Sequence, residues 1–380
     1  MTLDPGTAAL YEAHAEAWTA AREGKNVAAA HRLAERAGPD PAGPFLDIGC
    51  GPGLLTEHLP DPVIGLEPVE AFLDILGARA PRVVGVRGEA GHLPFATGSI
   101  GAALVTSVYV HVSRRGLPMA LAELHRVLAD GAPAELVMFG GDLDLEPTEG
   151  DSFGPRKYSH WPEADLQRVV VGGGFDIEQW TTHDHTAWPH YSISLRRSLT
   201  LPDTVGPAMD VLVCGLNPSV YSAEVRVGFG RPGNRFWPAA IAAGLVEIDR
   251  DPARALLDHG IGMTDLVKRA TPRADALTTD EYRAGLERVR WLCEWLQPRV
   301  VCFVGLSGWR AAADRHATAG WQDGDLGGSA VYVMPSTSGL NAHARLDDLT
   351  EHLREVRARA RRSPRRRRPP GRAGSTGPGT

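Results

Sequence analysis

The sequence predicts two consecutive α/β domains, each built around a mostly parallel sheet. Its 380 residues exceed the size of one typical domain and are enough for two, each with its own core. Two short apolar runs, 45–48 and 209–215, lead into glycine-containing loops, as buried strands of α/β folds do. A polar stretch containing Pro and Gly, residues 198–207, lies between the two patterns. We therefore expect domains over 1–197 and 208–360, joined by a linker at 198–207.

The first domain opens with Ala-rich segments of helical spacing, followed by a glycine-rich loop. Gly49, Gly51 and Gly53 follow the strand 45–48, and residues 54–58 are expected to open a helix. In such a strand–loop–helix unit, glycine lets a nucleoside ligand approach the backbone closely. A second predicted strand ends in Glu67, where an acidic side chain can accept hydrogen bonds from ribose hydroxyls.

These residues resemble the nucleotide loop of class I S-adenosylmethionine-dependent methyltransferases, and segments 87–95, 100–106 and 123–131 agree in order. The resemblance covers about residues 8–197 and implies a Rossmann-like methyltransferase domain. The cofactor-binding residues that it implies are Asp47, Gly49, Gly51, Gly53, Glu67, Glu89 and Thr106. Glu89 stands where the family usually has Asp. A dinucleotide-binding Rossmann domain, or a degenerate fold that no longer binds cofactor, remains the alternative.

The methyl acceptor is not identified by the sequence. The segment 106–112 lacks both the Asp/Asn-Pro-Pro-aromatic motif of amino-directed DNA methyltransferases and a Pro-Cys nucleophile. We expect Tyr109 and His111 to line an acceptor pocket, with His111 a candidate general base near neutral pH. A lone His at a strand end is more often structural.

The second domain carries the more specific motif, Gly215-Leu-Asn-Pro-Ser219, followed by the block 229–237. Together with blocks 260–269 and 334–340, it resembles the mismatch-specific uracil/thymine DNA glycosylases, the Mug/TDG family, over about residues 208–360. The resemblance implies an α/β/α fold of the uracil-DNA-glycosylase type with a central, mostly parallel sheet. Asn217 is the implied catalytic residue, which orients the attacking water.

The same resemblance assigns roles around Asn217. Phe229 is implied to stack on the flipped base, and Leu340 to fill the gap that this base leaves in the duplex. Arg269 makes either a structural ion pair or a phosphate contact, and the structural option is favoured. The residues implied in the base pocket and in DNA contact are Ser222, Phe229, Asn234, Arg269, Ser336, Gly339 and Leu340.

The implied reaction is hydrolytic excision of uracil opposite guanine in double-stranded DNA, with G·T as a further substrate. Ser219, the pair Met334-Pro335 and Ala342 depart from residues common in the family, which leaves lesion preference open. Two alternatives remain. In the first, the second domain is a non-catalytic binder of damaged DNA that targets the methyltransferase to nucleic acid. In the second, the methyltransferase is the main activity and acts on a small molecule or a nucleic acid, with the second domain as its DNA-binding guide.

Composition adds limits on partners and location. Residues 1–200 carry 15 Lys and Arg against 26 Asp and Glu, whereas residues 353–380 carry ten Arg and one Glu. We expect 361–380 to be a disordered, DNA-attracting tail. The start of the chain lacks a secretion pattern, no apolar run approaches membrane-spanning length, and no spacing of the four Cys suggests a metal site. A cytoplasmic protein, nucleoid-associated when bound to DNA, is the expectation.

Overall fold

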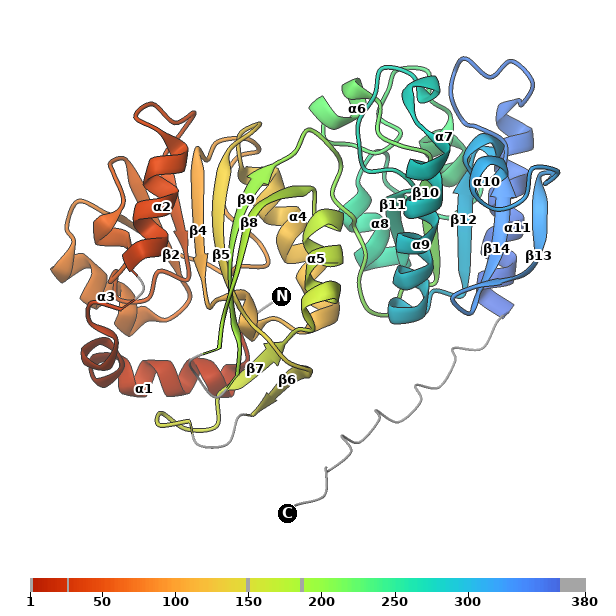
Figure 1. Cartoon of the computed structure of the whole chain (residues 1–380). Coiled ribbons are helices and arrows are strands. Elements are labelled where there is room, and N and C mark those ends of the chain that lie inside the picture. Colours follow the sequence, from red (N-terminus) through yellow and green to blue (C-terminus); the bar gives the residue numbers. More distant parts are fainter. Residues whose placement is uncertain (1–2, 26, 148–150, 185–187, 363–380) are drawn as a thin grey trace.

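The computed structural model describes residues 3–25, 27–147, 151–184 and 188–362. In this part of the chain, two layered α/β units stand side by side (Figure 1). The first contains a seven-stranded sheet and the second a five-stranded sheet. The predicted α/β class with mostly parallel sheets is therefore confirmed. Residues 363–380, which include most of the predicted tail, lie outside the described residues.

The N-terminal sheet has the strand order β3-β2-β1-β4-β5-β9-β8. Strands β1 to β5 run parallel, and β8 and β9 add an antiparallel edge beside β5. Because β1 has β2 on one side and β4 on the other, the carboxyl ends of these strands border the crevice where α/β sheets bind ligands. The bounds are β1 Phe45–Ile48, β2 Val63–Glu67, β3 Val84–Arg87, β4 Ala102–Thr106, β5 Pro133–Phe139, β8 Phe175–His183 and β9 His190–Arg197.

Helices cover both faces of this sheet, and a short hairpin extends from its lower end in Figure 1. The first helix begins after Asp4, whose side chain accepts a hydrogen bond from the backbone N–H of Thr7 and so caps the helix. The helices are α1 Pro5–Arg22, α2 Val27–Ala37, α3 Glu70–Arg79, α4 Leu117–Val127 and α5 Glu163–Gly172, and the hairpin strands are β6 Leu143–Pro147 and β7 Lys157–His160.

The segment after the glycine loop differs from the prediction. Residues 54–58 were expected to open an α-helix, but they contain only the short 3-10 turn Thr56–His58. Pro60 follows closely, and a residue before proline is disfavoured in helical conformation. Leu59 is accordingly extended, with a ψ of 144°. A helix therefore cannot propagate from this loop.

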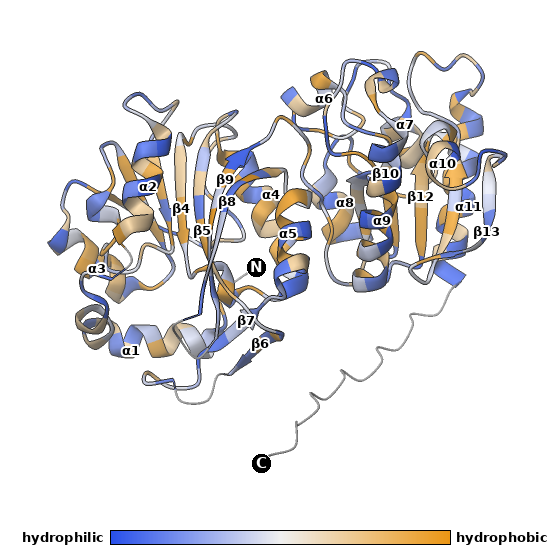
Figure 2. Cartoon of the chain, viewed as in Figure 1, coloured by the Kyte–Doolittle hydropathy of each residue, from blue (hydrophilic) through white to orange (hydrophobic). Residues whose placement is uncertain are grey.

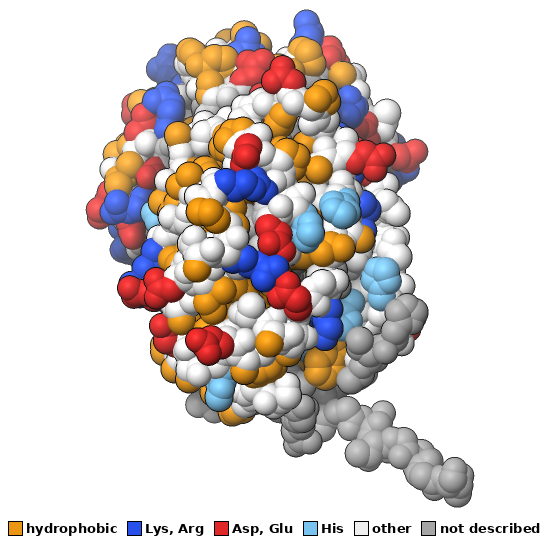
Figure 3. Space-filling model, turned by 90° about the vertical axis from the view of Figure 1, so that its left-hand side faces the viewer, with side chains coloured by type: hydrophobic (Ala, Val, Ile, Leu, Met, Phe, Trp, Pro, Cys, Tyr) orange, Lys and Arg blue, Asp and Glu red, His pale blue; other side chains and the backbone are white. Residues whose placement is uncertain are grey.

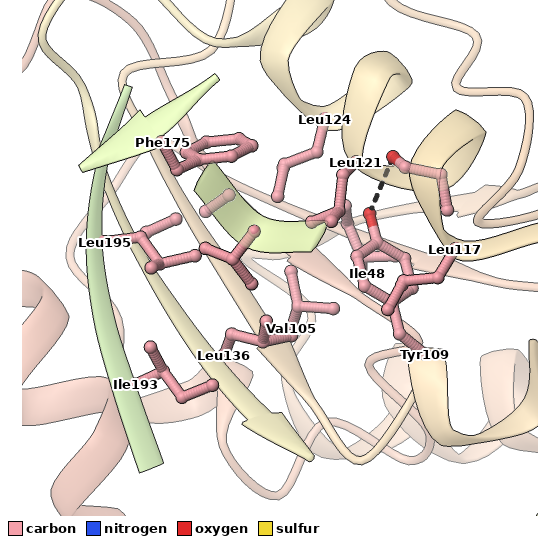
Figure 4. Close-up of a cluster of buried hydrophobic side chains, with 14 of the residues drawn as sticks. Ile48, Val105, Tyr109, Leu117, Leu121, Leu124, Leu136, Phe175, Ile193 and Leu195 are labelled. Carbon is pink, nitrogen blue, oxygen red and sulfur yellow. Dashed lines mark hydrogen bonds between the residues drawn. The ribbon is translucent and has the colours of Figure 1, made fainter. Parts of the chain in front are cut away.

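The core of the N-terminal unit lies between the sheet and helices α4 and α5. Ile48 from β1 and Leu121 from α4 belong to this cluster (Figure 4). Tyr109 also belongs to it, since its side chain is fully buried and its hydroxyl donates to the carbonyl of Ala120 at 3.2 Å. The expectation that Tyr109 lines an acceptor pocket is therefore wrong, because the turn after β4 directs this side chain into the core.

The C-terminal sheet has the order β11-β10-β12-β14-β13, with only β13 antiparallel to its neighbour. Its central strand β12 is buried along its whole length, as the continuous apolar run predicts. The edge strand β13 was not anticipated by the sequence analysis. The bounds are β10 Val211–Gly215, β11 Ile261–Asp265, β12 Val300–Val304, β13 Gly320–Leu326 and β14 Ser329–Met334.

Six helices cover this second sheet in the described residues. The longest, α9, starts with a capping box formed by Thr278 and Glu281. The strands form an apolar layer between helices that are polar on their outer sides (Figure 2). The bounds are α6 Val220–Glu224, α7 Phe236–Ala242, α8 Pro252–His259, α9 Thr279–Leu296, α10 Leu306–Ala312 and α11 Leu346–Arg362.

Residues 198–207 pack against both units. Leu201 and Val205 are buried, and Thr204 forms a β-bridge with Met263. The carboxylate of Asp203 pairs with Lys268 at 2.8 Å and with Arg288 at 2.6 Å, while its backbone N–H donates to the carbonyl of Gly172 at 2.7 Å. The junction is therefore held by buried polar and apolar contacts.

An aromatic cluster adds to this junction. Trp295 of α9 stacks on Trp291 with ring centroids 5.0 Å apart, and it meets Trp161 of the N-terminal unit edge-on at 5.8 Å. The guanidinium of Arg168 on α5 lies 5.5 Å from the ring of Trp291. Aromatic and cation–π contacts of this kind contribute on the order of 0.5–1.5 kcal/mol each beyond area burial.

Charged side chains of both signs are interspersed on the face of the N-terminal unit shown in Figure 3. Ion pairs around α3, which lies at this end of the molecule, include Arg79 with Glu57 at 2.7 Å and Arg87 with Glu70 at 2.9 Å. This face therefore shows no continuous basic surface that would attract duplex DNA.

All four cysteines are free and buried. Among the described residues, none of the helices combines the length and the apolar character needed to cross a bilayer.

Candidate functional site

The N-terminal unit contains a cavity of about 260 Å³ at the carboxyl ends of β1, β2 and β4. Five of the seven predicted cofactor residues line it: Gly49, Gly51, Glu67, Glu89 and Thr106. Residues of α1 close the other side, among them Tyr11 and Trp18. The combination of glycines, acidic side chains and aromatic rings suits a nucleoside ligand.

Glu67 is the best-defined polar group of this cavity. One carboxylate oxygen accepts from the backbone N–H of Gly51 at 2.9 Å and the other from that of Val69 at 3.1 Å. Burial raises the pKa of Glu67 to about 7, although both backbone hydrogen bonds oppose the shift. The carboxylate is thus held in one orientation at the cavity wall.

Asp47 and Gly53 do not line the cavity. Asp47 is buried and accepts from the hydroxyl of Thr56 at 2.6 Å. Gly53 has a φ of 87°, and a Cβ there would lie 2.4 Å from the side chain of Leu76. Both residues therefore shape the loop that carries Gly49 and Gly51.

His111 lines the cavity, but both of its ring nitrogens are engaged. Nδ1 lies 2.8 Å from the carbonyl of Lys157 and therefore donates to it, which leaves Nε2 to accept from the hydroxyl of Tyr11 at 2.9 Å. Burial lowers the pKa of His111 to about 4. The histidine is therefore neutral at pH 7. The hydrogen bond from Tyr11 must break before Nε2 can take a proton from a methyl acceptor.

A second cavity, of about 210 Å³, lies at the carboxyl ends of β10, β11 and β12 in the C-terminal unit. Five of the predicted residues line it: Asn217, Ser222, Phe229, Asn234 and Ser336. Four of them lie between β10 and α7, in α6 and the loops on either side of it, and Ser336 follows β14, more than 100 residues later in the sequence. The parallel sheet brings them together because both strands end at the same edge.

The amide of Asn217 has a defined orientation. Its Nδ2 donates to the hydroxyl of Thr271 at 2.8 Å and to the carbonyls of Arg269 and Pro218, each at 3.1 Å. The hydroxyl of Thr271 donates its own hydrogen bond to the carbonyl of Arg273 at 2.9 Å, so its oxygen acts as the acceptor toward Asn217. Because every neighbour of Nδ2 is an acceptor, Oδ1 is left to accept from a water or a ligand.

Phe229 forms one wall of this cavity and has an unusual backbone. Its φ is 56°, in the left-handed region that bulky residues seldom adopt. Its ring stacks on Phe236, with centroids 4.2 Å apart and planes 21° from parallel. Phe236 and Trp237 are fully buried, and Asn234 accepts from the backbone N–H of Phe236 at 2.9 Å.

The remaining predicted residues lie outside the cavity. Arg269 pairs with Glu281 at 2.8 Å, which favours the structural option. Gly339 approaches the backbone of Gly233, and Leu340 is 82% exposed at the tip of its loop. The guanidinium of Arg235 supports this loop, donating to the carbonyls of Ser338 and Asn341, each at 2.7 Å.

Two residues of the second cavity were not singled out from the sequence. Thr271 lies just beyond the matched block 260–269 and becomes significant only through its contact with Asn217. Asp265 ends β11, and its carboxylate approaches so closely that a Cβ at Gly215 would lie 2.3 Å from it. An acidic residue at the carboxyl end of a predicted parallel strand was a signal that could have identified it.

Burial raises the pKa of Asp265 to about 6, and the negative charge of Asp203 adds to the shift. The positive charges of Lys268 and Arg288 oppose it. Within the described residues, no three His, Cys, Asp or Glu side chains gather in a way that could hold a metal ion.

Family models match both halves of the chain. Residues 46–134 match a methyltransferase domain, and residues 202–360 match the uracil DNA glycosylase superfamily. The chain thus combines a methyltransferase domain with a domain of the uracil DNA glycosylase superfamily.

Solved structures similar to this chain include three methyltransferases. A methyltransferase from Methanosarcina mazei is 18% identical, with a TM-score of 0.38, over 42% of this chain and 94% of its own. The 1,6-didemethyltoxoflavin-N1-methyltransferase of Burkholderia thailandensis is 18% identical, with a TM-score of 0.41, over 50% and 84%. The geranyl diphosphate C-methyltransferase of Streptomyces coelicolor is 15% identical, with a TM-score of 0.38, over 52% and 89%.

Proposed function

We propose that the C-terminal domain is a monofunctional DNA glycosylase of the Mug/TDG type, which excises uracil opposite guanine in double-stranded DNA. The observation that carries this proposal is the oriented amide of Asn217 at the edge of the cavity. Thymine opposite guanine and damaged pyrimidines are further candidate substrates. Excision leaves an abasic site, the product expected of a base excision repair enzyme.

The reaction breaks the bond between the anomeric carbon and the base nitrogen. Positive charge develops on the sugar and negative charge on the departing base, while water adds to the anomeric carbon. With Nδ2 held by its three acceptors, Oδ1 of Asn217 accepts a hydrogen bond from this water and orients it. An amide is not a strong base, so catalysis depends on positioning and electrostatics, and a slow enzyme is expected.

The cavity wall supports binding of a flipped pyrimidine. The ring of Phe229 offers a stacking surface, and base–aromatic stacking contributes about 1–3 kcal/mol per base. Ser222 and Asn234 supply polar groups. No lysine lines the cavity among the described residues, so a Schiff base and strand cleavage by the enzyme itself are not expected.

We expect the loop after β14 to contact the duplex. The exposed side chain of Leu340 can occupy the gap left by the flipped base, and Ser336 and Ser338 border the cavity where flanking phosphates would pass. These features support DNA as the partner of this domain.

Excision from a labelled duplex with one G·U pair, followed by alkaline cleavage of abasic sites, tests the proposal. Wild-type protein should release uracil, and Asn217→Ala should lose at least about 100-fold in rate. Equal thermal unfolding of the two proteins would exclude a folding defect. Binding of the duplex with no excision by either protein would instead support a non-catalytic DNA binder that guides the methyltransferase.

We also propose that the N-terminal domain uses S-adenosylmethionine, on the evidence of Glu67 held beside Gly51 at the cavity wall. The residues fit a nucleoside cofactor, because Glu67 and Glu89 can accept from ribose and adenine groups, and the glycines admit it to the backbone. When bound, the cofactor supplies an activated methyl group on a sulfonium centre. The neighbouring side chains of His111 and Tyr158 border the space left for a methyl acceptor of unknown identity.

A further inference from the structure

The loop between α6 and α7 carries Phe229 into the second cavity, beside Asn217, which is the base cavity of the proposed glycosylase. The same loop also reaches the N-terminal domain. Three residues before Phe229, the side chain of Arg226 leaves its own domain and is 15% exposed. A Cβ at Gly98 of the N-terminal domain would lie 2.9 Å from its guanidinium. The loop is therefore in direct contact with the methyltransferase domain.

Arg226 makes its polar contacts at the carboxyl end of α4. Nη1 donates to the carbonyl of Arg126 and, at 3.3 Å, to that of Leu128, while Nη2 donates to the carboxylate of Asp130 at 3.1 Å. The last carbonyls of a helix have no partners within the helix and carry partial negative charge. Arg226 thus caps α4 from the other domain with charge-assisted hydrogen bonds.

The receiving end of this contact is itself well supported. The guanidinium of Arg126 donates to the carbonyls of Leu93 and Phe95, at 2.9 and 2.8 Å, and pairs with Glu123 at 2.8 Å. The backbone carbonyl of Arg126 also accepts from the N–H of Gly98 at 2.9 Å, so it is held within its own domain. A rigid acceptor is what a positioning contact requires.

The backbone of the loop needs such support. Arg226 and Phe229 both have left-handed φ angles, 59° and 56°, although neither is Gly, Asn or Asp. Each such residue costs about 1 kcal/mol or more and persists only where the surroundings determine it. Phe229 is held by stacking on Phe236. The backbone N–H of Arg226 donates to the carbonyl of Ala223 at 3.3 Å, and its side chain is held by the other domain.

We propose that Arg226 is a positioning residue, through which the methyltransferase domain holds the loop of Phe229 in the geometry that base excision needs. This inference rests on the proposed glycosylase function. Leu201 of the junction points to the same dependence, since it lines the base cavity and packs beside Gly228. The N-terminal domain and the junction thus complete a site whose reacting groups belong to the C-terminal domain.

The test compares the full-length wild type with Arg226→Asn and Arg226→Lys. Asparagine tolerates a left-handed backbone, so Arg226→Asn removes the anchor without adding strain. It should lower kcat for a G·U duplex by about 10- to 100-fold with little change in KM, because small displacements of a positioned group cost this much. Arg226→Lys keeps a charge near Asp130 but loses the fork of donors, and should recover part of the loss.

Hydrogen exchange of the peptides covering 222–235 gives a second readout that does not need activity. These amides should exchange faster in Arg226→Asn and to a lesser degree in Arg226→Lys. The matched control is Arg283→Ala, which removes an exposed ion pair within α9 and should change neither readout.

A kcat for Arg226→Asn within twofold of wild type overturns the inference, as does unchanged exchange in the loop. If the wild type excises no base, the proposed function fails, and the exchange comparison alone then decides whether Arg226 positions the loop. If Arg226→Asn does not fold, the Arg226→Lys comparison decides both measurements.

Discussion

The side-chain nitrogen of Asn217 donates to the hydroxyl oxygen of Thr271 at 2.8 Å, across 54 residues of sequence. Thr271 is almost fully buried, and its own proton is committed to the carbonyl of Arg273. The hydroxyl therefore acts toward Asn217 as a fixed acceptor. This contact distinguishes the two ends of the amide and leaves Oδ1 as its accepting end.

Replacing Thr271 by valine should impair excision through this orientation. Val keeps the shape of Thr but offers Nδ2 no acceptor, so the amide loses one of its three restraints. We expect kcat to fall by about 10-fold, the usual consequence of one lost hydrogen bond of about 1 kcal/mol or slightly more, with KM nearly unchanged. Steady-state excision from a G·U duplex measures both. Thr271→Ser, which keeps the hydroxyl, is the matched control, and equal kcat in Val and Ser variants would contradict this role.

Asp265 should make excision slower as the pH rises through about 6, the value to which burial raises its pKa. Below that pH the carboxyl group is neutral. Above it, a negative charge faces the base cavity and opposes the negative charge that develops on the departing base. The pH profile of kcat should therefore fall above pH 6 in the wild type and be flatter in Asp265→Asn. A wild-type rate that rises with pH through this range would exclude this role.

The same shift affects stability. The pKa of Asp265 is higher in the folded state than its ordinary value of 3.8, so the folded state binds the proton more tightly. The stability associated with this proton is present below pH 3.8 and is lost as the pH rises through 3.8 to about 6. Asp265→Asn should therefore gain stability relative to wild type at pH 8 more than at pH 5. Chemical denaturation at the two pH values measures the difference.

Short stretches of sequence account for the strands and helix starts that depend only on residues close together in the chain. The run 300–304 is a buried strand because it is continuously apolar, and helix α9 begins at Thr278 and Glu281 because they form a capping box. The prediction of a helix over 54–58 was wrong because Pro60 lies two residues beyond the turn Thr56–His58.

Contacts between distant segments could not be predicted in this way. Thr271 reaches Asn217 only because β10 and β11 are adjacent in the sheet, and Arg226 reaches Asp130 only because two domains pack at a particular angle. Neither relationship leaves a periodicity or a spacing in the sequence. Tyr109 shows the converse, since its place after a strand suggested a pocket whereas the turn buries it.

Glu67 should make cofactor binding depend on pH. Burial raises its pKa to about 7, so below pH 7 one carboxylate oxygen carries a proton and becomes a donor, which weakens the acceptance of hydrogen bonds from ribose hydroxyls. Affinity for S-adenosylhomocysteine, measured by calorimetry on the full chain, should be lower at pH 6 than at pH 8. Glu67→Gln should lose about 10-fold or more at pH 8 and show a weaker pH dependence. Affinity that is equal at both pH values in the wild type would contradict ligand contact by this carboxylate.

Leu340 should act only on duplex DNA. Its side chain is 82% exposed, so Leu340→Ala removes few contacts within the protein and should leave thermal unfolding unchanged. An apolar side chain inserted into the duplex offsets the stacking that is lost when a base flips out, a cost of a few kcal/mol. Leu340→Ala should therefore slow excision from a G·U duplex by about 10-fold or more. Uracil in single-stranded DNA needs no such replacement, so its excision should change little. An equal loss on both substrates would mean that Leu340 acts on the cavity itself and not as a wedge.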